Sequence, residues 1–204
     1  WVLALDLLFT MPRHAVRPNT VSFNAAISAC GAGAEWQLAL KLLQILEEHD
    51  VPDTVSGNAV ISACEECGQW EAALHVLSHW MPSHGLSLHV IGVSSAMSAC
   101  EKGSRWVEAF QLLRGMVSWR CLPNEISYNS MLKAAEAAGH WQLVMSLLEE
   151  MDKILGADLI AYNTATMVLT ASFVNNTSLQ CLLNERLPPE LLRALRAISG
   201  VTNV

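Results

Sequence analysis

The sequence predicts an all-α, right-handed superhelical solenoid of antiparallel helix pairs, and three observations lead to this prediction. A tryptophan recurs every 34 to 36 residues, at Trp1, Trp36, Trp70, Trp106 and Trp141. Apolar residues follow each tryptophan at offsets of 3, 4, 7 and 10 residues, which trace one face of an α-helix. A fixed period in this range is typical of solenoids in which each unit buries its apolar face against its neighbours.

The repeat divides the chain into a partial unit, four complete units and an irregular end. The predicted boundaries are 1–19, 20–53, 54–89, 90–124, 125–158 and 159–204. Each complete unit holds two helical segments, which in the first unit run from Thr20 to about Cys30 and from Glu35 to about Glu48. Glycines are expected to separate the two segments, at Gly31, Gly33, Gly68, Gly103 and Gly139. The end of the chain is expected to form a degenerate repeat and capping helices.

Most unit boundaries carry the same two signals. Proline ends the preceding helix, and an Asn or Asp then caps the next helix by accepting a hydrogen bond from its free N–H groups. The predicted caps are Asn19, Asp53, Asn124 and Asp158. The boundary at 87–89 lacks both signals and is predicted to be the weakest.

Composition and charge narrow the class of protein. The 204 residues are 52% hydrophobic and carry a net charge of −7, which excludes a disordered chain and argues against indiscriminate binding to nucleic acid or anionic membranes. No apolar run reaches the length that spans a bilayer, so we expect a soluble protein without a membrane partner. Because Trp1 enters the pattern halfway through a unit, we expect the true N-terminus and any targeting peptide to be missing.

The first helix of each unit begins with a β-branched residue that is followed three positions later by a polar one. Residues three apart share a helical face, so each unit offers an apolar side chain beside an amide or a hydroxyl. The copies read Val-Ser-Phe-Asn at 21–24, Val-Ser-Gly-Asn at 55–58, Ile-Gly-Val-Ser at 91–94, Ile-Ser-Tyr-Asn at 126–129 and Ile-Ala-Tyr-Asn at 160–163.

Together with Pro-Asn or Pro-Asp at the boundary and Trp-x-x-Ala-Leu-x-Leu-Leu in the second helix, as at 18–43, these motifs resemble the pentatricopeptide repeat family over residues 1 to about 168. The resemblance implies sequence-selective binding of single-stranded RNA, one base per repeat. It further implies support of RNA processing, stability or translation in a mitochondrion or plastid, by occlusion or by recruiting protein processing factors.

The resemblance also implies roles for particular residues. The base-reading pairs are Asn24 with Asp53, Asn58 with His89, Ser94 with Asn124, and Asn129 with Asp158, and Asn163 begins a further one. In the order of these pairs, the implied bases are uridine, a pyrimidine, adenosine and uridine. The second base is not specified further, because His89 is an unusual partner. Base stacking is assigned to Val21, Val55, Ile91, Ile126 and Ile160. Phosphate contact is assigned to Lys102 and Lys133, although acidic residues such as Glu65 and Glu66 crowd the same part of the repeat.

Other classes of function are less well supported. A protein-binding scaffold of the tetratricopeptide type has a similar period, but it places its tryptophan in the first helix, whereas this chain places it in the second. We expect no enzyme, small-molecule substrate or cofactor, because neither a phosphate loop nor a nucleophile elbow is present. The order of two cysteines and two histidines at Cys64, Cys67, His75 and His79 resembles a zinc-finger motif, but the gap between the two pairs is too short, so we expect no bound metal. We also expect the cysteines to be reduced.

Overall fold

The computed structural model describes residues 1–173, and within that range the chain forms helices and turns without a β-strand. The predicted all-α fold class is confirmed for these residues. The chain divides into two compact units, one comprising Trp1–Pro123 and one that begins at Asn124. The capping helices predicted near 182–183 and 191–196 lie outside the described residues.

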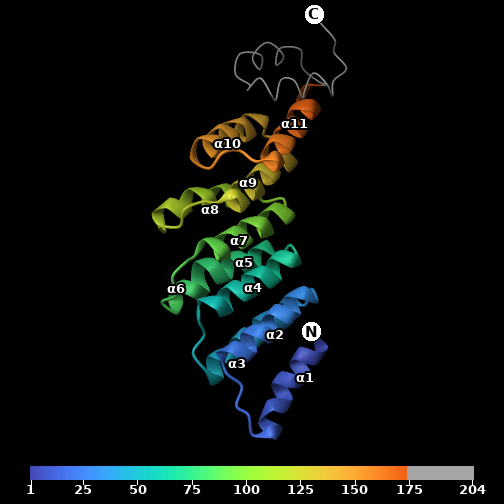
Figure 1. Cartoon of the computed structure of the whole chain (residues 1–204), viewed down its shortest axis with the longest axis vertical. Helices are drawn as coiled ribbons and strands as arrows, with labels where there is room; N and C mark the ends of the chain where they lie inside the picture. Colours follow the sequence, from blue (N-terminus) through green and yellow to red (C-terminus); the bar gives the residue numbers. More distant parts are fainter. Residues whose placement is uncertain (174–204) are drawn as a thin grey trace, which may run out of the picture. The chain divides into compact units, whose positions relative to one another are not determined.

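The first compact unit contains a lone helix and three helix pairs (Figure 1). Helix α1 (Val2–Thr10) is followed by the 3-10 turn η1 (Met11–His14). The pairs are α2 (Thr20–Ala32) with α3 (Trp36–His49), α4 (Thr54–Glu66) with α5 (Trp70–His75), and α7 (Val90–Lys102) with α8 (Trp106–Ser118). The first helices of the pairs pack side by side, α2 against α4 and α4 against α7.

The second compact unit repeats this arrangement. Helix α9 (Glu125–Ala137) pairs with α10 (Trp141–Ile154), and α11 (Leu159–Phe173) packs against both. None of the described helices is long and apolar enough to cross a membrane.

The core consists of the residues that follow each tryptophan at helical spacing. Those at offsets 3 and 7 in the complete repeats, and most at offset 10, are at most 3% exposed: Ala39, Ala73, Ala109, Val144, Leu43, Leu77, Leu113, Leu148, Leu46, Met116 and Met151. The tryptophans themselves lie at the edge of this core, since Trp1 is 43% exposed and the others are half-buried. Burial at offsets 3, 7 and 10 follows the predicted helical face, whereas most residues at offset 4, such as Leu40 and Leu74, are half-buried.

One three-residue turn joins the helices of every pair. Its middle residue has a left-handed backbone, with φ of 58° at Ala34, 64° at Gly68, 57° at Ser104 and 73° at Gly139. The residue after it donates its N–H to a carbonyl five positions back, for example from Glu35 to Cys30 at 2.9 Å. This closing bond satisfies a helix end that would otherwise lack a partner.

The predicted helix breaks are correct at Gly68 and Gly139 and wrong at Gly31. Helix α2 continues through Gly31 to Ala32. Gly31 is buried, and a Cβ at this position would lie 3.1 Å from Ala63. Gly31 therefore permits close packing of α2 on α4 and does not end the helix. Gly33 and Gly103 cap their helices with φ of −88° and −82°, and the left-handed residue follows them.

The four predicted helix caps are present. Asn19, Asp53, Asn124 and Asp158 each accept a backbone N–H from the third residue after them, at 2.8–3.0 Å. His89 makes no such bond with its side chain. Among the five boundaries within the described residues, the one before α7 is therefore the one without a side-chain cap.

Differences in repeat length fall in the second half of each unit. From the boundary residue to the next tryptophan the distance is always 17 residues, as from Asn19 to Trp36 or from His89 to Trp106. The distance from Trp70 to His89 is 19 residues, against 17 from Trp36 to Asp53. In this longer stretch α5 continues into the π-helical turn η2 (Val76–Trp80) and the short α6 (Met81–Ser83), and a π-turn accommodates an inserted residue. The first helices thus keep their register.

Replacing Gly103 with alanine is expected to destabilise the first compact unit by about 1–3 kcal/mol, because the new Cβ would lie 2.4 Å from the Trp70 ring. Urea unfolding followed by tryptophan fluorescence measures the change. Ser104→Ala, at the next residue of the same turn, is the control. It should change stability by no more than about 0.5 kcal/mol, because alanine already occupies that left-handed position at Ala34. Equal effects of the two substitutions would contradict the proposed contact.

Candidate nucleic-acid interface

Five apolar side chains are exposed at equivalent positions of the first helices. Each lies two residues after a boundary residue, where the helix begins. The exposed fractions are 74% for Val21, 59% for Val55, 65% for Ile91, 60% for Ile126 and 51% for Ile160. These are the residues to which base stacking was assigned. An apolar side chain exposed once per repeat at the same place indicates a surface that a flat apolar group can cover.

Two of the predicted polar pairs are in contact. The amide nitrogen of Asn24 donates to Asp53 Oδ1 at 3.1 Å, and that of Asn129 donates to Asp158 Oδ2 at 2.9 Å. In both pairs the partners are 29 residues apart in sequence, and the aspartate is the last residue of the same repeat. The amide of one first helix is therefore held by the residue that caps the next first helix.

Asp53 carries both roles at once. Its Oδ1 accepts the backbone N–H of Ser56 at 2.8 Å, the Ser56 hydroxyl at 2.8 Å and the Asn24 amide at 3.1 Å. Partial burial by itself raises the pKa of this carboxyl, but the hydrogen bonds from Ser56 and Asn24 outweigh it and leave the pKa below its ordinary value. Asp53 is therefore ionised at neutral pH and keeps its acceptor role.

The amide oxygens at three of these polar positions are buried without a hydrogen-bond partner among the described residues. They belong to Asn24, Asn58 and Asn129. A buried acceptor that lacks a donor costs about 1–3 kcal/mol relative to a paired one.

The other predicted pairs have different outcomes. No hydrogen bond joins Asn58 to His89, although the structure describes both residues, and His89 Nε2 lies 3.2 Å from the Ser87 hydroxyl. Ser94 is buried on α7, whereas Asn124 caps α9 in the other compact unit, so their pairing stays a prediction. Asn163 is exposed on α11.

The predicted phosphate contacts lie in an acidic setting. Lys102 Nζ is 3.9 Å from Glu65 Oε1 and 4.0 Å from Glu66 Oε2, so carboxylates of α4 already neutralise it. Lys133 is exposed on α9. Surface ion pairs of this kind contribute about 0–1 kcal/mol, which a phosphate can displace at a modest cost in affinity.

Sequence reasoning missed the residue three positions after each boundary. Ser56 and Ser127 complete capping boxes with Asp53 and Asn124, and Ser22 also hydrogen bonds to its own boundary residue, Asn19. At the equivalent position the third repeat has Gly92. The serines recurring in three of the motif copies were the available signal, and Gly92 and Ala161 depart from it.

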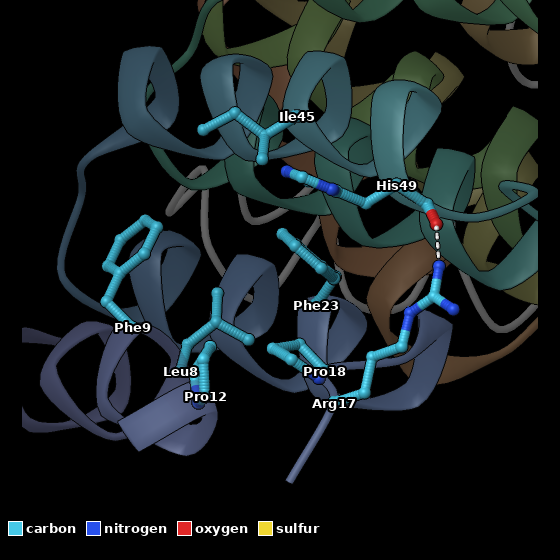
Figure 2. Close-up of a pocket in the computed structure, with 8 residues that line it drawn as sticks. All are labelled: Leu8, Phe9, Pro12, Arg17, Pro18, Phe23, Ile45 and His49. Atoms are coloured by element: carbon cyan, nitrogen blue, oxygen red, sulfur yellow. Dashed lines mark hydrogen bonds between the residues drawn. The ribbon is translucent and has the colours of Figure 1, made fainter. Parts of the chain in front are cut away.

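A cavity of about 260 Å³ lies between α1, η1, α2 and α3 (Figure 2). Phe9, Ile45 and Phe23 contribute apolar surface to it, and at its edge the Arg17 guanidinium donates to the His49 carbonyl at 3.3 Å. These lining residues present no grouping of acid, base and nucleophile. The exposed residues at the starts of the first helices therefore remain the candidate site.

The residues of the zinc-finger-like motif do not lie together in the structure. Cys64 is fully buried, whereas His75 and His79 are exposed with their rings stacked at 5.3 Å. Among residues 1–173 no group of three or more His, Cys, Asp or Glu side chains is arranged to hold a metal ion.

Residues 93–121 and 126–154 match the family model of the PPR repeat. No curated protein matches the chain in sequence. Two solved structures of similar fold have low sequence identity to it. The PPR domain of Arabidopsis thaliana protein-only RNase P 1, crystallised with tRNA, is 14% identical with a TM-score of 0.69, over 83% of this chain and 90% of that chain. The pentatricopeptide repeat protein PPR10, crystallised with an 18-nt psaJ RNA element, is 20% identical with a TM-score of 0.72, over 92% of this chain and 27% of that chain.

Proposed function

Because this chain contains pentatricopeptide repeats, as its motifs predict, we propose that it binds single-stranded RNA selectively, with one base per repeat. One observation supports the proposal most strongly. In every repeat of the described range an exposed β-branched residue stands three positions before a polar residue on the same helical face. Two proteins with the same fold were crystallised with RNA, which favours RNA as the ligand.

The Asn–Asp pairs have the chemistry to discriminate between bases. One N–H of the Asn24 amide is held by Asp53, which leaves the second N–H as a donor for a ligand. Uracil presents carbonyl acceptors at its Watson–Crick edge, and one of them can accept this N–H. Asn129 with Asp158 repeats the arrangement, so the first and fourth bases are proposed to be uridine.

We propose that the RNA affinity is modest and that the protein does not alter the RNA chemically. Val and Ile offer less stacking than the aromatic platforms that contribute about 1–3 kcal/mol per base, and the net charge of −7 disfavours phosphates. The chain would act by covering an RNA segment or by recruiting a processing factor, without chemistry of its own. From the family resemblance we also propose that the protein acts in an organelle, either a mitochondrion or a plastid.

Fluorescence anisotropy at low salt tests the proposal. One labelled RNA carries uridine, cytidine, adenosine and uridine in a neutral context, and the other carries purines at the same places. The first RNA should bind more tightly, and Asn24→Ala or Asn129→Ala should each weaken it about fivefold, as expected for losing one base hydrogen bond worth about 1 kcal/mol. Gln37→Ala, on the exposed face of α3, should leave the affinity unchanged.

The opposite outcome has a specific interpretation. Equal or absent binding to both RNAs would contradict selective reading by these repeats. The acidic surface, including the carboxylates that neutralise Lys102, then favours the second candidate, a helical-repeat scaffold that binds other proteins. A search for partners of that surface would follow.

A further inference from the structure

The second repeat holds its polar residue in a different way from the first and the fourth. In those two repeats the asparagine amide donates to an aspartate of the next boundary. In the second repeat the Asn58 oxygen is buried, without a hydrogen-bond partner, 2.3 Å from the position that a Cβ would occupy on Gly92. The amide therefore occupies space that any other residue at position 92 would fill with its side chain.

Two departures from the repeat create this arrangement together. His89 replaces the capping aspartate or asparagine, and its ring lies beside Ser87. Gly92 replaces the serine whose hydroxyl holds the boundary side chain in place, as Ser56 holds Asp53 at 2.8 Å. Asn58 therefore has no carboxylate acceptor at residue 89. The missing side chain of Gly92 leaves a small space, here called the notch, that the Asn58 amide occupies.

The apolar part of this repeat is unchanged. Val55 is 59% exposed and Ile91 is 65% exposed, as at the equivalent positions of the other repeats. A base can therefore still be covered here by apolar side chains, while the amide that would discriminate between bases points into the notch at Gly92.

We infer that Gly92 and His89 make the second repeat a spacer, which binds a base of any identity without reading its edge. The inference rests on the proposed function. It assigns to Gly92 a specificity-determining role through its contact with Asn58. The chain would then select its target at the first and fourth bases and tolerate all four bases at the second.

Anisotropy with four RNAs that differ only at the second base tests this inference. The unmodified chain should bind all four within about twofold, whereas adenosine at the first or fourth base should weaken binding about fivefold. The double variant His89→Asp with Gly92→Ser rebuilds the boundary of the first repeat. It should prefer uridine at the second base by about fivefold, because Asn58 is expelled from the notch and regains its acceptor.

Three outcomes would overturn the inference. One is a preference of fivefold or more at the second base in the unmodified chain. Another is a reproducible second-base preference of the unmodified chain, of any size, that His89→Ala abolishes, which would mean that the imidazole reads the base. The third is a folded double variant that remains indifferent at the second base. Loss of preference at the first and fourth bases as well would instead contradict the proposed function itself.

A measurement without RNA tests the arrangement directly. In the unmodified chain, nuclear Overhauser effects should connect the Asn58 side-chain amide protons with the Gly92 α-protons, and they should vanish in Gly92→Ala. Only the flexible end of Asn58 has to move in this variant, so it should fold, and circular dichroism checks this. Effects from Asn58 to His89 in the unmodified chain would contradict the inference.

Discussion

Replacing Asp53 with alanine is expected to lower the free energy of unfolding of the first compact unit by about 2–4 kcal/mol. The substitution removes the cap of α4, which is worth about 1 kcal/mol. It also leaves the amide nitrogen of Asn24, a residue that is only 8% exposed, without its acceptor, which costs about 1–3 kcal/mol more. Urea unfolding of the whole chain, followed by far-ultraviolet circular dichroism, measures the loss.

Asp53→Asn is the matched control for this prediction. An asparagine still caps the helix, as Asn124 caps α9, and its oxygen can still accept from Asn24. The loss should stay below about 1 kcal/mol. Equal losses in the alanine and asparagine variants would show that the hydrogen bonds of residue 53 are not the cause.

The same residue gives the stability a defined dependence on pH. The pKa of Asp53 is lowered in the folded chain from its model-compound value of 3.8, because the bonds from Ser56 and Asn24 outweigh the opposing effect of burial. Its ionised form therefore stabilises the fold above pH 3.8, and this contribution is lost as the pH falls through the lower folded value. The unmodified chain should lose its advantage over Asp53→Asn in this acidic window and keep it from pH 5 to 8.

The fold could be predicted from the sequence because one helical periodicity recurs with little change. Residues such as Leu43 and Leu77 occupy the same offset position in successive repeats, and their burial follows from that phase alone. The Asn24–Asp53 contact was also predictable, since both residues recur in register and the constant 17-residue half of each repeat preserves their spacing.

Other features depend on contacts between repeats that a pattern does not contain. The position of the left-handed residue is set by the bond to the Cys30 carbonyl, so Ala34 takes this conformation although glycines stand nearby. The pairing of Lys102 with Glu65 joins residues 37 positions apart on neighbouring helices. The notch at Gly92 matters only because the amide of Asn58, from the preceding first helix, turns into it.

The thiols of Cys64 and Cys100 are expected to react with iodoacetamide at pH 8 about a thousandfold more slowly than an exposed cysteine. Burial raises the pKa of each to about 12, so only about one molecule in ten thousand holds the reactive thiolate at this pH, against about one in four at an ordinary pKa near 8.5. Peptide mass spectrometry with fragment-ion localisation gives the rate at each site.

Cys67, which lies one turn beyond Cys64 and is half-buried, is the internal control and should be alkylated first. In guanidinium chloride Cys64 and Cys67 should react alike, because unfolding removes the burial that protects Cys64. Comparable native rates at Cys64 and Cys67 would contradict the buried placement of Cys64. Fast alkylation of Cys67 in the native chain would also argue against a zinc site built from Cys64, Cys67, His75 and His79, because a bound zinc ion would hold and protect both thiolates.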